Sequence, residues 1–254
     1  MKNKKIEADI IIAINAMKKI MILFLGPFLT AYFIKTSKES LIDLSLYYVF
    51  SYIILAIGSF LVASIIKNKF RIGMFRIGVI LNFFYIMFII ILKEKIVDHL
   101  GLMSILYGIS SSAYWFSYNL FSINKIENIK RTEYTVKSKI VSSTIGIICP
   151  ILLGTIITAT NYELTAVIIL FISIIQIILS FMLTPDKENE LPKFNLKNTW
   201  NNLKDNNQIR KTSLVEFLIG MNVSDGALEI LMTILIFDSF KTNMNLGIIT
   251  SITT

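Results

Sequence analysis

Two carboxylates inside one apolar segment are the residues with the clearest capacity for chemistry. Asp225 and Glu229 lie near the middle of the segment 214–237. They are four residues apart, so a helix places them on one face together with Asn222. Burying an ionised carboxylate at the centre of a bilayer costs about 2.5–3.5 kcal/mol on insertion scales, so such a pair marks a functional site. We expect these three residues to bind a proton or a cation, unless a basic residue outside this sequence pairs with the acids.

A stripe of aromatic and hydroxyl side chains follows one face of the apolar segment 100–121. Its members recur at i, i+4, i+7, i+8 and i+11, which is the spacing of one helix face. Aromatic ring faces attract cations, and hydroxyls orient a ligand by hydrogen bonding. The stripe predicts a cavity for an amphipathic or cationic solute, or alternatively an aromatic belt at the membrane interface combined with ordinary packing. Its residues are Tyr107, Ser111, Tyr114, Trp115 and Tyr118.

Small residues form another candidate face, in the segment 140–158. Gly146, Pro150 and Gly154 recur at steps of four residues. In lipid, a face of small side chains lets a neighbouring helix approach closely. Pro150 also removes one backbone hydrogen bond and bends the helix. This small-residue face predicts either a static packing surface or a contact that moves.

The segments that carry these residues are long enough to cross a bilayer. The chain of 254 residues is 54% hydrophobic and only 17% charged, and its mean hydropathy is +0.68. About 20 apolar residues span the hydrocarbon core, where every backbone group must be paired, so each run is a helix. We therefore expect an all-α polytopic membrane bundle with about seven complete transmembrane helices and a truncated eighth. The runs are 17–34, 41–66, 72–92, 100–121, 140–158, 164–183, 214–237 and 246–254.

The distribution of basic residues predicts the orientation of the chain. If the N-terminus is cytoplasmic, 20 of the 25 Lys and Arg residues fall in cytoplasmic segments and 5 fall outside. Membrane proteins show this asymmetry, so the net charge of +8 needs no nucleic-acid partner. We expect residues 6–17 to form an amphipathic segment that leads into the first span. Lys18 and Lys19 then reach back to the inner membrane interface.

The spacing of the runs divides the chain into two sets of helices. The segment between the sixth and seventh runs is long, basic and polar. Within it, Leu196, Trp200 and Leu203 have the spacing of a short helix that lies on the membrane surface. We expect a six-helix bundle at 1–183, a cytoplasmic linker at 184–212 and the start of another bundle at 213–254.

Two further carboxylates have a local explanation. Asp43 follows Ser40 by three residues, and Glu216 follows Ser213 by the same interval. Both pairs have the spacing of a capping box, in which the acid accepts a hydrogen bond from a free backbone N–H at a helix start. We expect a helix to begin at each pair.

This layout is similar to the major facilitator superfamily, whose transporters join two six-helix bundles. Arg71 matches the arginine of the Gly-Arg-Lys end of the family's loop between helices two and three, although Lys67 and Asn68 replace its Asp-Arg pair. Pro150 and Gly154 match the fifth-helix pattern Gly-x-x-x-Gly-Pro-x-x-Gly-Gly of the family's drug antiporters. The resemblance implies about four more spans after residue 254. It also implies that Arg71 and the small-residue face serve packing or conformational change.

The resemblance further implies alternating access, in which one bundle rocks against the other around a central site. We expect a secondary active transporter of the bacterial plasma membrane that couples a proton or cation to export of a small amphipathic or cationic solute. Its partners are then the solute, the coupling ion and the lipid bilayer. Uptake by a permease of the same superfamily, or a non-transporting or truncated membrane protein, are the alternatives.

An enzyme is not expected. One Cys and one His exclude an internal disulfide and leave almost no metal chemistry. The sequence has no Gly-rich phosphate loop, so no ATP site is expected either. We therefore predict no catalytic residue, no metal and no cofactor.

Overall fold

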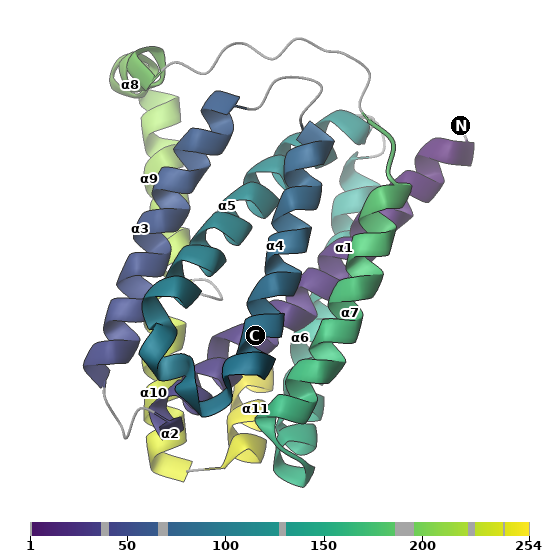
Figure 1. The fold of residues 1–254 in the computed structure, drawn as a ribbon. Coiled ribbons are helices and arrows are strands. Elements are labelled where there is room, and N and C mark those ends of the chain that lie inside the picture. Colours follow the sequence, from purple (N-terminus) through teal and green to yellow (C-terminus); the bar gives the residue numbers. More distant parts are fainter. Residues whose placement is uncertain are drawn as a thin grey trace.

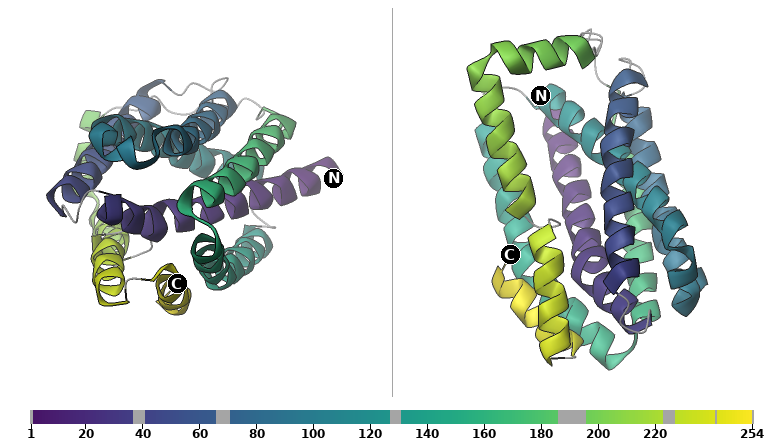
Figure 2. Two further views of the ribbon diagram at one scale, coloured as in Figure 1. Left: turned by 60° about the horizontal axis from the view of Figure 1, so that its bottom comes forward. Right: turned by 90° about the vertical axis from the view of Figure 1, so that its left-hand side faces the viewer.

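Helices make up the whole regular structure of the described part of the chain. The computed structural model describes residues 2–36, 41–65, 71–126, 131–185, 196–222, 227–240 and 242–253. Most helices run roughly along one long direction, whereas α8 lies across the end of the bundle at which α1 starts (Figure 1 and Figure 2). The elements are α1 (Lys2–Leu23), η1 (Phe24–Phe28), α2 (Leu29–Thr36), α3 (Leu41–Ile65), α4 (Arg71–Leu92), η3 (Lys93–His99), α5 (Leu100–Lys125), α6 (Arg131–Ala159), α7 (Tyr162–Met182), α8 (Leu196–Asp205), α9 (Asn207–Asn222), α10 (Ala227–Phe240) and α11 (Asn243–Thr253).

The predicted all-α class is confirmed. The run predicted as one span at 214–237 is described as two helices, α9 (Asn207–Asn222) and α10 (Ala227–Phe240). Four continuous helical stretches of the described residues are long and apolar enough to cross a membrane: 41–65, 71–120, 131–159 and 162–182. The stretch 71–120 contains both α4 and α5, joined by the 3-10 helix η3. Less than half of the most apolar window of each stretch is buried, and large apolar side chains such as Ile42 and Phe171 are exposed. Apolar helices that expose this much apolar surface indicate a membrane protein.

The first helix differs from its predicted course. Helix α1 begins at Lys2 rather than at a span start near residue 17, and η1 and α2 continue it to Thr36. The predicted lead-in segment 6–17 is part of the bundle, because Ile11 and Ile14 are buried in a cluster with Phe75 of α4. The run α1–η1–α2 lies in the centre, between a layer of α3, α4 and α5 and a layer of α6, α10 and α11 (Figure 2).

Helix α9 also begins earlier than predicted. The capping box expected at Ser213 and Glu216 is wrong, because both residues lie inside α9. The helix starts at Asn207, where the Oδ1 of Asn206 accepts hydrogen bonds from the backbone N–H of Gln208 (3.0 Å) and Ile209 (3.3 Å). An asparagine at this position satisfies free backbone donors as well as a serine does. The short helix expected in the linker is present as α8. Ser40, of the capping box predicted with Asp43, lies outside the described residues.

One arginine joins α4 to the end of α7. The Nε of Arg76 donates to the carbonyl of Ser180 (3.2 Å), and its Nη2 donates to the carbonyl of Leu183 (3.0 Å). The guanidinium carbon also lies 4.6 Å from the ring centroid of Phe181. The last carbonyls of a helix have no partner within it, so a cation placed there stabilises the helix end.

We predict that Arg76→Met destabilises the bundle. Hydrogen bonds to charged groups contribute about 1.5–3 kcal/mol, so the free energy of unfolding should fall by about that amount. Thermal melting of the purified protein in detergent measures the change. Arg76→Lys should recover only part of the lost stability, because an ammonium group lacks the planar arrangement of N–H donors that a guanidinium group presents to the carbonyls. Equal melting temperatures for Arg76→Met and the wild type would show that this contact does not stabilise α7.

Candidate functional site

A lysine lies in the interior of the bundle. The Nζ of Lys18 on α1 donates a hydrogen bond of 2.9 Å to the Oδ1 of Asn82 on α4. The side chains of Lys18 and Asn82 are only 1% and 2% exposed. The prediction that Lys18 reaches the inner interface is wrong, because α1 is continuous and central and carries this residue between other helices. A buried ionisable group in an apolar helix bundle is expensive, and such groups mark ion or substrate pathways.

The predicted aromatic stripe on α5 lies next to Lys18. The Nζ of Lys18 lies 5.2 Å from the ring centroid of Tyr114, a side chain with no exposed surface. The ring of Tyr118 stacks on that of Tyr114 at a centroid distance of 5.8 Å, and its hydroxyl is 3.1 Å from that of Tyr134 on α6. The cation held at the Tyr114 ring is therefore a side chain of the protein itself.

The other members of the stripe are divided between the interior and its edge. Ser111 is buried, whereas Trp115 and Tyr107 are half-buried. The Tyr107 ring lies 5.7 Å from that of Tyr85, whose hydroxyl is 2.5 Å from the hydroxyl of Tyr47. Helix α5 thus carries a polar aromatic face into the bundle, as its spacing predicts. Whether this face binds a solute stays a prediction.

A glutamine adds to the polar interior one helical turn from Lys18. The Nε2 of Gln176 on α7 donates to the backbone carbonyl of Ile14 (3.1 Å). The Oε1 of Gln176 and the hydroxyl of Tyr114 are buried and have no hydrogen-bond partner within the described residues. Buried polar atoms are normally paired, so unpaired ones mark a functional or hydrated interior. We call Lys18, Asn82, Tyr114 and Gln176 the central cluster.

The predicted carboxylate site falls largely outside the described residues. Asn222 is the last residue of α9, and Glu229 is the third residue of α10. Asp225 lies between the two helices, in the part of the chain that the structure does not describe. The arrangement of these three side chains therefore stays a prediction.

The small-residue face of α6 packs against α11. A Cβ added to Gly154 would lie 2.6 Å from the backbone oxygen of Asn243, and one added to Gly247 would lie 2.4 Å from the backbone oxygen of Pro150. The hydroxyl of Ser251 also donates to the carbonyl of Ile147. The absence of side chains on the two glycines therefore allows direct contact between the backbones of α6 and α11.

Two other residues predicted to serve packing or conformational change lie in the interior. Gly146 is buried one turn before Pro150 on α6. Arg71 is the first residue of α4 and is only 2% exposed. The structure places both inside the bundle, and a role in conformational change stays a prediction.

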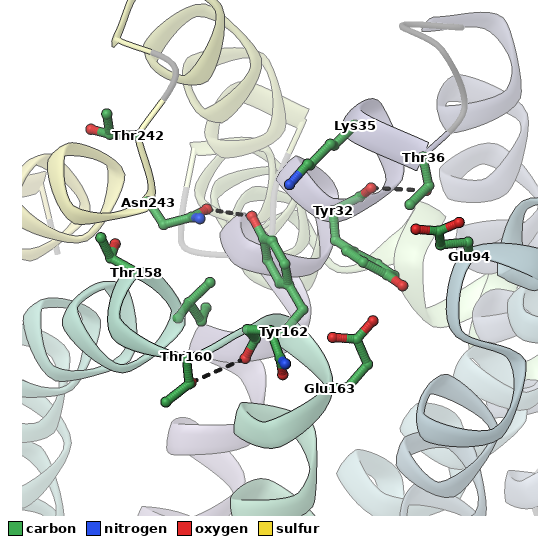
Figure 3. Close-up of a pocket in the computed structure, with 12 residues that line it drawn as sticks. Tyr32, Lys35, Thr36, Glu94, Thr158, Thr160, Tyr162, Glu163, Thr242 and Asn243 are labelled. Atoms are coloured by element: carbon green, nitrogen blue, oxygen red, sulfur yellow. Dashed lines mark hydrogen bonds between the residues drawn. The ribbon is translucent and has the colours of Figure 1, made fainter.

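A pocket opens at the end of the bundle opposite α8 (Figure 3). Its volume is about 560 Å³. The lining residues come from the end of α2, from η3, from the ends of α6 and α7 that meet there, and from the start of α11. All of these connections are predicted to lie outside the cell, so their convergence at one end agrees with the predicted alternation of spans. The lining is Tyr32, Lys35, Thr36, Glu94, Ile157, Thr158, Thr160, Asn161, Tyr162, Glu163, Thr242 and Asn243.

Comparisons with known proteins assign no activity. No protein-family model matches the chain. The chain is similar to the uncharacterized protein YqgE of Bacillus subtilis (strain 168), with 22% identity over an alignment of 258 positions. The alignment covers 97% of this chain and 59% of the relative, so the chain spans about three fifths of the relative's length. The similarity extends along nearly the whole chain.

Proposed function

We propose that the chain is part of a secondary active transporter similar to the major facilitator superfamily, which exchanges protons for a cationic amphipathic solute across a bacterial plasma membrane. The main support is the buried Lys18, hydrogen-bonded to Asn82 inside an apolar helical bundle. A protein that needed only to fold in lipid gains nothing from this lysine, because an apolar side chain of similar volume packs there at lower cost.

The position of Lys18 provides a way to couple a proton to the solute. Its Nζ is 5.2 Å from the centre of the Tyr114 ring, the face on which an organic cation would bind. Two unit charges about 5 Å apart repel by about 3 kcal/mol at an effective dielectric constant of about 20. A protonated Lys18 and a bound cation therefore exclude each other. Antiport requires a site of this kind, which holds the proton or the solute but not both.

The contact between α6 and α11 supports the alternation of access. Helix α6 precedes the linker 184–212, and α11 follows it. The two helices meet through backbone atoms at Gly154 and Gly247 rather than through interlocking side chains. A smooth interface of this kind suits two helical units that rock against each other. In this proposal Asp225 and Glu229, which also follow the linker, receive the solute cation or the proton.

Transport of a lipophilic cation tests the proposal. The protein at its full native length is reconstituted into liposomes, and tetraphenylphosphonium accumulation is followed under an imposed pH gradient without ATP. We expect accumulation when the lumen is acidic, because protons leave as the cation enters. Accumulation equal to that of protein-free liposomes, for both tetraphenylphosphonium and ethidium, would contradict export of a cationic amphipathic solute.

A further inference from the structure

The pocket opposite α8 has the size and the charges of a small-molecule site. Its volume of about 560 Å³ lies within the range of about 300–1,000 Å³ typical of ligand pockets. Two carboxylates line it, Glu94 from η3 and Glu163 from α7, together with one ammonium group, that of Lys35. The charged groups of the lining thus leave an excess of one negative charge, which favours a positively charged ligand.

Local structure holds the Glu163 side chain at the wall of the pocket. Asn161 caps α7, and its Oδ1 accepts a hydrogen bond of 2.7 Å from the backbone N–H of Leu164. Glu163 is therefore in the first turn of α7, where the helix dipole favours a negative charge. Glu94 enters from the other side, on the short helix that follows α4 (Figure 3).

A buried tyrosine hydroxyl points between the two carboxylates. The side chain of Tyr32 is only 5% exposed. Its hydroxyl is buried and makes no hydrogen bond of standard geometry within the described residues. Figure 3 shows this hydroxyl on the side of the pocket where Glu94 and Glu163 lie. A ligand N–H that donates to the Tyr32 oxygen would satisfy it, and the same ligand could donate to both carboxylates.

Aromatic rings form the apolar wall next to these oxygens. The rings of Tyr32 and Tyr162 lie 4.8 Å apart at an interplanar angle of 42°. The hydroxyl of Tyr162 donates to the Oδ1 of Asn243 on α11, which holds the ring in place. Ring faces attract ammonium groups and pack against the apolar part of a ligand.

We propose that this pocket binds a primary organic amine, with its ammonium group between Glu94, Glu163 and the Tyr32 hydroxyl and its apolar part against the rings of Tyr32 and Tyr162. A metal ion is a poorer fit, because no group of three His, Cys, Asp or Glu side chains within the described residues could hold one. Amine binding at this end of the bundle does not depend on the proposed transport through the centre.

Binding of 2-phenylethylamine and of its neutral analogue 2-phenylethanol tests the proposal without any mutation. Both are titrated into the purified full-length protein by calorimetry. We expect the amine to bind at least about tenfold more tightly, because only the amine forms charged hydrogen bonds with the carboxylates. Equal affinity for the two compounds, or displacement of the amine by equimolar Ca²⁺, would overturn the proposal.

Matched variants locate the amine within the pocket. Glu163→Gln and Glu94→Gln should each raise the dissociation constant of 2-phenylethylamine by about tenfold. Tyr32→Phe removes only the hydroxyl and should raise it by about threefold to tenfold. Glu133→Gln, at the far end of α6 and exposed, should leave it unchanged. Unchanged binding in both pocket Glu variants, with melting temperatures equal to that of the wild type, would place the amine elsewhere.

Discussion

Replacing Lys18 by Met should abolish proton-coupled movement of tetraphenylphosphonium without unfolding the bundle. The wild-type ammonium group is hydrogen-bonded to Asn82 and lies on the Tyr114 ring. The variant has no charge that competes with the solute, so proton and solute are no longer linked. We expect the pH-driven accumulation of tetraphenylphosphonium to fall to the level of protein-free liposomes.

Stability separates this prediction from simple misfolding. Replacing a buried charge by an apolar side chain of similar volume is often neutral or stabilising, so Lys18→Met should melt at or above the wild-type temperature. Lys19→Met is the matched control, because the neighbouring residue is half-buried and lies on a different face of α1. It should transport at nearly the wild-type rate. Wild-type transport by a well-folded Lys18→Met variant would remove Lys18 from the mechanism.

Replacing Gly247 by Ala should force α6 and α11 apart. The added Cβ would lie 2.4 Å from the carbonyl oxygen of Pro150. This atom belongs to the backbone and cannot rotate away, so one of the helices must move. Overpacking of this kind costs about 1–3 kcal/mol. We expect a lower melting temperature in detergent, followed by tryptophan fluorescence, and slower transport by the same protein in liposomes.

Another glycine provides the control for the effect of alanine itself. A Cβ at Gly101, in the first turn of α5, meets no atom within 4 Å. Alanine is favoured over glycine in helices by up to about 1 kcal/mol, so Gly101→Ala should melt at or slightly above the wild-type temperature. If Gly247→Ala behaved in the same way, the close contact between α6 and α11 would not exist in the protein in solution.

The positions of most helices could be predicted from the sequence, because they depend on local composition. Long apolar runs define α3 and α4 to within a residue of their observed bounds. The predicted start of α9 is wrong, because two local signals for a helix start compete. Ser213 and Glu216 have the spacing of a capping box, but Asn206, where the chain leaves α8, caps the helix instead.

The interior of the bundle could be predicted only in part. The spacing on α5 indicates a polar aromatic face, and the small residues on α6 indicate a closely packed neighbour. The identity of each neighbour depends on tertiary structure. Asn82 is 64 residues away from Lys18 along the chain, so a lysine at the edge of an apolar run looked like a membrane-interface residue. Only the continuous course of α1 places it inside.

The pocket could not be predicted from the sequence, for a related reason. Glu94 and Glu163 are unremarkable in the sequence, because charged residues are usual in connections between spans. Their proximity depends on several connections that converge at one end of the bundle. The predicted orientation of the spans places all of these connections on one side of the membrane, and this is the signal that could have brought the two residues together.

The exchange of protons for a lipophilic cation measures antiport directly. Liposomes that contain the full-length protein and the pH indicator pyranine receive tetraphenylphosphonium from outside, with no imposed pH gradient and with the membrane potential clamped. We expect the lumen to become more alkaline as the cation enters, and we expect no such change with the Lys18→Met variant. Cation entry without any change of luminal pH, or a pH change of equal size in the Lys18→Met variant, would contradict proton-coupled antiport through Lys18.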